Sequence, residues 1–123
     1  MTQIMVVDDN EDVAETVSIA LNEAGYAATA VHSLDDARRL LSGGNYAGAI
    51  IDVWMNEDNG LELASELAQH TPPIPFIIMS GGGPGKTLEQ VTARADSIGA
   101  VAVLFKPFED DELLTAVSTM LNG

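Results

Sequence analysis

Five polar side chains follow short apolar segments at four widely separated places in the sequence. Asp8 and Asp9 follow one segment, Asp52 a second, Ser80 a third and Lys106 a fourth. Carboxylate oxygens bind hard divalent cations such as Mg²⁺, and a carboxylate can also act as a nucleophile. A lysine ammonium and a serine hydroxyl can hold phosphoryl oxygens. Together these groups could carry out phosphoryl transfer to aspartate, provided that the fold brings them together.

Each of these residues also has a simpler interpretation. The two neighbouring aspartates could, with Asn10, cap a following helix. Asp52 could be a turn residue, Ser80 could belong to a flexible loop, and Lys106 could be a solvated charge. Whether these residues form one chemical site therefore depends on the strands and helices that position them.

Five short apolar runs rich in β-branched residues predict buried strands. Near-continuous hydrophobicity of this kind is typical of a parallel sheet that is covered on both faces. The expected strands are residues 4–7, 27–31, 49–51, 75–79 and 101–105.

The segments between these runs have helical periodicity. Val13, Val17 and Leu21 repeat at helical spacing, and Gly25 follows as a stop signal. Helix starts of the capping-box type are predicted at Ser33 with Asp36, Asn59 with Glu62 and Thr87 with Gln90, and a last helix after Asp110.

The alternation predicts an α/β fold of the (βα)5 type, a doubly wound five-stranded parallel sheet with strand order 2-1-3-4-5, as in flavodoxin-like proteins. In this order a crevice opens at the carboxyl ends of the strands, where the chain reverses direction between strands 1 and 3. The five polar residues follow strands 1, 3, 4 and 5, which are neighbours. Carboxylates brought together there would repel by roughly 4 kcal/mol per pair at 4 Å, and a divalent cation would offset that cost.

The same segments resemble the receiver domains of bacterial two-component response regulators. The match covers the whole chain, which we expect to be one stand-alone receiver domain over residues 1–123 with no output domain. It is carried, in this order, by Val6-Val7-Asp8-Asp9-Asn10, Ile51-Asp52, Met79-Ser80 and Phe105-Lys106-Pro107-Phe108.

The resemblance implies a role for each residue of the crevice. Asp52 would be the phosphoacceptor, and Mg²⁺ would be bound by Asp9, Asp52 and the backbone carbonyl of Trp54. Asp8 would act on the metal largely through water. Ser80 and Lys106 would hold the phosphoryl oxygens, and Lys106-Pro107 would be a cis peptide.

The resemblance also implies partners and a cellular setting. The phosphoryl group would come from a sensor histidine kinase or a phosphotransfer protein, and the domain would catalyse only its own phosphorylation and dephosphorylation. A downstream protein would meet the face formed by helix 4, strand 5 and helix 5.

Composition and net charge disfavour several other classes of protein. The net charge of −14 disfavours binding to nucleic acid or anionic lipid. The chain has no cysteine, so disulfides and thiolate metal sites are excluded. No apolar run approaches the roughly 18 residues that a membrane span needs. We therefore expect a cytoplasmic protein.

Two positions depart from the family pattern. Asn56 stands four residues after Asp52, where receivers usually have proline, and Val103 stands three before Lys106, where they usually have an aromatic residue or histidine. Switching is therefore expected to rest on Ser80 and the glycine-rich segment 81–85.

The sequence leaves two other functions open. Gly85-Lys86-Thr87 ends a segment that is one residue short of a phosphate-binding P-loop, because Ser80 stands where that motif begins with glycine. A nucleotide-binding protein would, however, leave Asp8, Asp9 and Lys106 without a role. The second alternative is a receiver-like binding module that is never phosphorylated.

Overall fold

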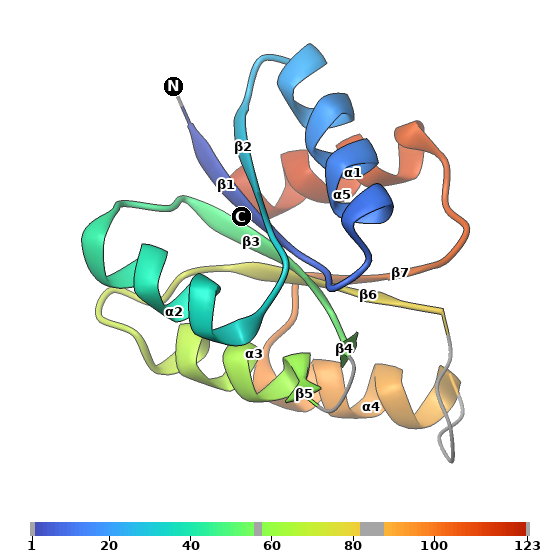
Figure 1. The fold of residues 1–123 in the computed structure, drawn as a ribbon. Coiled ribbons are helices and arrows are strands. Elements are labelled where there is room, and N and C mark those ends of the chain that lie inside the picture. Colours follow the sequence, from blue (N-terminus) through green and yellow to red (C-terminus); the bar gives the residue numbers. More distant parts are fainter. Residues whose placement is uncertain (1, 56–57, 82–87, 123) are drawn as a thin grey trace.

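The computed structural model of the chain describes the backbone of residues 2–55, 58–81 and 88–122, and their side chains except those of 54–55, 58–59 and 88–91. Its main sheet has five parallel strands in the order β2-β1-β3-β6-β7 (Figure 1). The predicted strand order is confirmed. The strands are β1 (Gln3–Val7), β2 (Ala27–Val31), β3 (Gly48–Asp52), β6 (Phe76–Ser80) and β7 (Ala102–Phe105).

Five helices cover the two faces of this sheet. Figure 1 shows α1 and α5 together on one face, and α2, α3 and α4 on the other. Alternate strand residues enter the two resulting cores, so that Val6 and Ile50 face α1 and α5 whereas Val7 and Ile51 face the opposite side. The helices are α1 (Glu11–Glu23), α2 (Leu34–Gly43), α3 (Gly60–Gln69), α4 (Leu88–Ile98) and α5 (Asp110–Asn122).

Two of the expected helix-boundary signals are confirmed, one at the start of α2 and one at the end of α1. The Ser33 hydroxyl accepts a hydrogen bond from the backbone N–H of Asp36 (3.1 Å) at the start of α2. Gly25 adopts a positive φ of 98° just after α1, a conformation that favours glycine. The expected start at Thr87 lies outside the described residues, and so does the side chain of Asn59, which was expected to cap α3.

A two-stranded antiparallel ladder was not predicted. It pairs β4 (Trp54–Met55) with β5 (Asp58–Asn59), between the end of β3 and the start of α3. Strands of two residues carry no periodic pattern that a sequence analysis could recognise. This ladder shapes the chain directly after Asp52.

Candidate functional site

Four of the five predicted site residues occupy the carboxyl ends of adjacent strands. Asp52 is the last residue of β3 and Ser80 the last of β6, while Asp8 and Lys106 directly follow β1 and β7. Asp8 and Ser80 have no exposed surface, and Asp52 is 4% exposed. Buried polar groups of this kind need partners, because burial without them is costly.

Lys106 is the cation that joins two of the buried carboxylates. Its Nζ lies 2.8 Å from Oδ2 of Asp8 and 3.3 Å from Oδ1 of Asp52. Burial by itself lowers the pKa of the Lys106 ammonium, but the hydrogen bond to Asp8 and the charges of Asp52 and Asp8 outweigh burial and raise that pKa. Lys106 therefore stays charged at neutral pH and holds both carboxylates toward one point.

Asp8, Asp9 and Asp52 form a carboxylate group that we call the aspartate cluster. One carboxylate oxygen from each lies within 4.8 Å of those of the other two. Three negative charges face one ammonium, which leaves a formal charge of −2. Hard carboxylate oxygens with an excess of two negative charges fit a divalent cation such as Mg²⁺.

Asn10, and not either aspartate, caps the following helix. Its Oδ1 accepts hydrogen bonds from the backbone N–H groups of Asp12 (3.1 Å) and Val13 (3.2 Å). Asp8 instead accepts the backbone N–H of Asn10 at Oδ1 (2.9 Å) and the Lys106 ammonium at Oδ2. The simpler capping interpretation therefore applies to Asn10, whereas Asp8 and Asp9 belong to the cluster.

Gly60 is a residue of the site that the sequence analysis missed. Its backbone N–H donates to the Val53 carbonyl at 3.0 Å. A Cβ placed on Gly60 would overlap the Asp52 carbonyl oxygen and lie 2.9 Å from Cγ2 of Ile51. Glycine at this position lets the start of α3 pack directly on the backbone of Asp52. No local sequence pattern signals this requirement.

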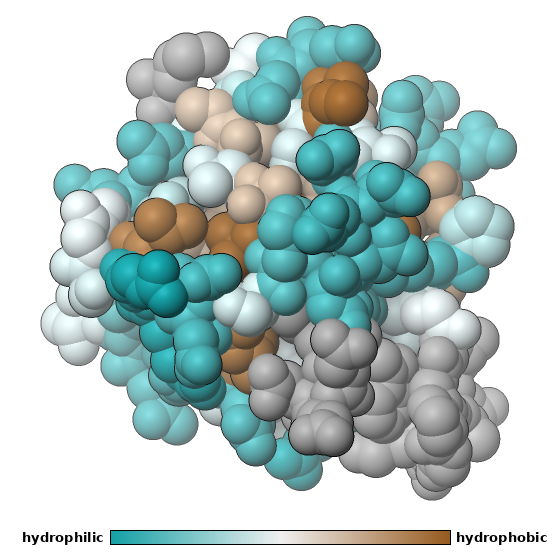
Figure 2. All heavy atoms as spheres, in the orientation of Figure 1, coloured by the Kyte–Doolittle hydropathy of each residue, from teal (hydrophilic) through white to brown (hydrophobic). Residues whose placement is uncertain are grey.

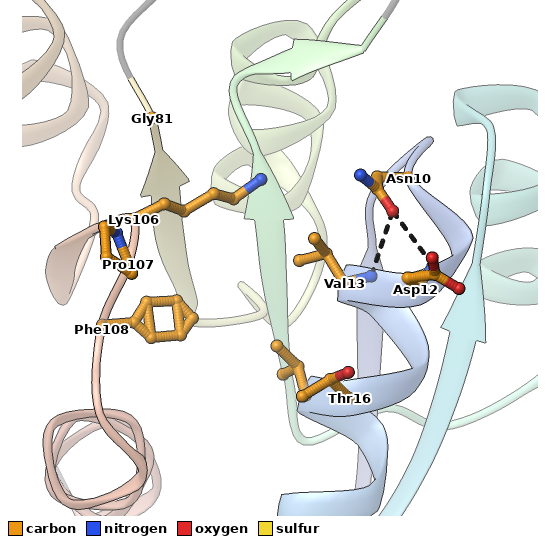
Figure 3. Close-up of a pocket in the computed structure, with 9 residues that line it drawn as sticks. Asn10, Asp12, Val13, Thr16, Gly81, Lys106, Pro107 and Phe108 are labelled. Atoms are coloured by element: carbon orange, nitrogen blue, oxygen red, sulfur yellow. Dashed lines mark hydrogen bonds between the residues drawn. The ribbon is translucent and has the colours of Figure 1, made fainter.

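A cavity of about 520 Å³ opens beside the cluster, between α1 and the segment after β7. Figure 3 shows Val13 and Thr16 of α1 on one side and the ring of Phe108 on the other, with the Lys106 side chain above them. The wall is largely apolar. The lining residues are Asn10, Asp12, Val13, Thr16, Val17, Gly81, Lys106, Pro107 and Phe108.

The rest of the expected site is only partly described. The Lys106-Pro107 peptide is cis, as expected. Trp54 begins β4, but its side chain is not described. Asn56, most of the glycine-rich segment, Gly85, Lys86 and Thr87 lie outside the described residues.

Comparison with known proteins identifies the family. The family model described as the response regulator receiver domain matches residues 4–118. The chain belongs to this family. Its members are signalling domains, and neither the nucleotide-binding alternative nor the never-phosphorylated module is favoured.

One curated relative and two solved structures illustrate the similarity. The response regulator SaeR of Staphylococcus aureus (strain USA300) is 31% identical over 98% of this chain and 51% of that protein. The chain thus spans about half the length of the curated relatives that it matches. A CheY-like receiver domain from Methanospirillum hungatei JF-1 shares the fold, with a TM-score of 0.88 at 20% identity over 99% of this chain and 94% of that chain.

The second structure is a response regulator from Burkholderia pseudomallei. It has a TM-score of 0.82 at 27% identity and covers 94% of this chain and 66% of that chain. That protein was crystallised with a phosphorylated aspartic acid, a calcium ion and citrate.

The described surface is mainly hydrophilic, and the described helices are short and amphipathic. In the view of Figure 2 hydrophilic residues cover most of the described face, and apolar patches are small and separate. Among the described residues no helix has the length and apolar character needed to cross a membrane.

Proposed function

We propose that this receiver domain accepts one phosphoryl group on Asp52 in a Mg²⁺-dependent reaction. The observation that carries the proposal is the buried carboxylate of Asp52, whose Oδ1 lies 3.3 Å from the Lys106 ammonium within the aspartate cluster. A carboxylate held beside a fixed positive charge and a cation site is oriented for attack on phosphorus. The phosphorylated aspartic acid of the Burkholderia pseudomallei relative supports the same chemistry.

The bond changes in the proposed reaction are simple. A carboxylate oxygen of Asp52 forms a bond to phosphorus while the bond from phosphorus to the donor atom breaks. With a phosphohistidine donor the leaving group is the imidazole, which keeps the electron pair of the broken bond. The product is an aspartyl phosphate, a mixed anhydride that water can later hydrolyse.

Each residue around Asp52 has a proposed role in this reaction. Asp9, Asp52 and the backbone carbonyl of Trp54 would bind Mg²⁺, which when bound neutralises charge on the phosphoryl oxygens. Both carboxylate oxygens of Asp8 already accept hydrogen bonds, from Asn10 and Lys106, so Asp8 is best suited to contact the metal through water. Lys106 and Ser80 would hold phosphoryl oxygens.

Two surfaces would serve two partners. A histidine kinase or phosphotransfer protein would approach over the cavity between α1 and Phe108, because this opening lies beside the cluster and includes Lys106 in its lining. A downstream protein would meet the face of α4, β7 and α5. We expect this signalling to take place in the cytoplasm, with no role for nucleic acid or membrane in binding to residues 1–123.

Intact mass measurement tests the proposal. The purified chain is incubated with acetyl phosphate and Mg²⁺, and the wild type should gain one adduct of about 80 Da, the mass of a phosphoryl group. The adduct should be absent in Asp52→Asn and in excess EDTA. Asp96→Asn, which makes the same charge change on α4, should keep it. An adduct of that mass in Asp52→Asn would refute the assignment.

A further inference from the structure

The Asp9 carboxylate differs from the other two carboxylates of the aspartate cluster in how it is held. Asp8 accepts the backbone N–H of Asn10 and the Lys106 ammonium, and Asp52 also pairs with Lys106. Within the described ranges of the chain, no hydrogen bond or ion pair reaches the side chain of Asp9. The position of this carboxylate therefore depends on the backbone from which it projects.

The peptide that joins Asp8 to Asp9 is held by the chain at the end of β2. The backbone N–H of Asp8 donates to the Val31 carbonyl at 3.0 Å. The carbonyl oxygen of Asp8 lies 3.3 Å from Nδ1 of the His32 ring, at the long end of hydrogen-bond reach. A carbonyl oxygen can only accept, so Nδ1 carries the proton and donates. Because a peptide is planar, fixing this carbonyl also fixes the position of the Asp9 Cα.

His32 is itself anchored on both sides in the sequence. It directly follows β2, and it precedes Ser33, whose hydroxyl caps the start of α2. The His32 residue is half-buried. Its backbone therefore lies between a strand of the main sheet and a capped helix, and the imidazole is a donor in a defined place.

We propose that His32 is a positioning residue for the metal site, whose ring holds the peptide before Asp9 so that this carboxylate stays in the aspartate cluster. The inference rests on the proposed function, in which Asp9 binds Mg²⁺. Without the donor the peptide can turn, and repulsion from the other two carboxylates favours a half-buried Asp9 that points toward solvent. Binding of Mg²⁺ would then have to bring the ligand back, which weakens affinity.

Two substitutions of nearly equal shape separate the donor from the bulk of the ring. Asparagine offers an amide N–H as many bonds from the backbone as Nδ1, whereas leucine has the same branching and no donor. Calorimetric titration with Mg²⁺ alone measures the dissociation constant. We expect His32→Leu to raise it about tenfold and His32→Asn to keep it within about twofold of wild type, since groups that orient metal ligands commonly change metal affinity by about 10–100-fold. Equal dissociation constants in the two variants would overturn the proposal.

His70 offers a matched control. It is the other histidine of the chain, and its Nδ1 also lies within hydrogen-bond distance of a backbone carbonyl, that of Pro72, at 2.9 Å. It directly follows α3 and precedes β6, at the end of the sheet opposite the site. His70→Leu should leave the Mg²⁺ dissociation constant unchanged. An equal loss of affinity in His70→Leu and His32→Leu would contradict a role specific to His32.

The acetyl phosphate adduct, measured by intact mass, separates this inference from the proposed function. If wild type binds Mg²⁺ and gains the adduct while His32→Leu and His32→Asn bind Mg²⁺ alike, the inference about His32 is wrong and the proposed function stands. If wild type neither binds Mg²⁺ nor gains the adduct, both fail.

The natural sequence tests the contact without relying on the fold of His32→Leu. In a neutral imidazole one nitrogen carries the proton and the other does not, and ¹⁵N spectra distinguish the two. We expect the proton on Nδ1 in the neutral ring of His32, with His70→Leu used to assign the signals. A neutral His32 ring with its proton on Nε2 overturns the proposal, because Nδ1 then has nothing to donate to the Asp8 carbonyl.

Discussion

Replacing Asp9 by Asn should stabilise the metal-free domain, because it removes one of three carboxylates held within 4.8 Å. At that distance two unit charges interact by about 3.5 kcal/mol with an effective dielectric constant of 20. Asp9 lies near two negative charges, those of Asp8 and Asp52, and both of these carboxylates already pair with the Lys106 ammonium. The single positive charge that Asp8 and Asp52 share offsets about one of the two repulsions on Asp9, which leaves roughly the energy of one pair of like charges, about 3.5 kcal/mol.

Solvent reduces this value. Asp9 is half-buried, and partly exposed charges are screened by water and salt. We therefore expect Asp9→Asn to raise the free energy of unfolding by about 1–3 kcal/mol without metal. For a domain of this size that corresponds to a rise in Tm of several degrees, on the order of 3–15 °C.

Thermal unfolding followed by circular dichroism measures the effect with EDTA and with millimolar Mg²⁺. Wild type should gain stability from Mg²⁺, because a ligand that binds only the folded state raises its stability. Asp9→Asn should have a higher Tm than wild type in EDTA, and Mg²⁺ should raise that Tm little. Asp96→Asn, with the same charge change on the exposed surface of α4, should differ from wild type by less than about 0.5 kcal/mol. A variant that is equal to or less stable than wild type in EDTA would refute the electrostatic reasoning.

Three further changes probe other parts of the site. Gly60→Ala should lower the free energy of unfolding by about 1–3 kcal/mol and slow phosphorylation by acetyl phosphate, because the added Cβ overlaps the Asp52 carbonyl oxygen. In the control Gly43→Ala the added Cβ meets no atom within 4 Å, so this variant should be tolerated. Equal phosphorylation rates in the two variants would contradict the packing argument. Lys106→Met should lower the free energy of unfolding in EDTA by about 3 kcal/mol, because it leaves buried carboxylates without their cation. Urea unfolding measures this change, and an unchanged midpoint would show that the Lys106 ion pairs contribute nothing to stability. Mg²⁺ should change the fluorescence of Trp54, two residues beyond Asp52, and Asp9→Ala should abolish that response; a persisting response would exclude Asp9 as a ligand.

Most of the fold could be predicted because its signals are local. Five apolar runs, each followed by a segment of helical period, specify the strands, and the handedness of strand–helix–strand connections leaves few orders for them. That order alone brings Asp8, Asp52, Ser80 and Lys106 to one edge of the sheet. The convergence of the site was therefore predictable before any distance was known.

The features that escaped prediction depend on contacts between distant segments. Gly60 matters because α3 packs on the backbone of Asp52, and a glycine at a helix start has no distinctive spacing. The β4–β5 ladder is too short to carry a period. The exposure of Phe105 was not predicted, because this residue ends an apolar run that is typical of a buried strand. It is exposed because an edge strand is covered less completely than a central one.

Borohydride reduction of the phosphorylated protein tests the central claim most directly. An aspartyl phosphate is reduced to the alcohol of homoserine, whereas a free carboxylate is not, so the modified residue is marked permanently. After treatment with acetyl phosphate and Mg²⁺, then borohydride and proteolysis, the peptide that contains Asp52 should be about 14 Da lighter at that residue, the difference between a carboxyl group and its alcohol. Peptides that contain Asp8 and Asp9 should be unchanged. Homoserine at Asp8 or Asp9, with Asp52 intact, would contradict the account.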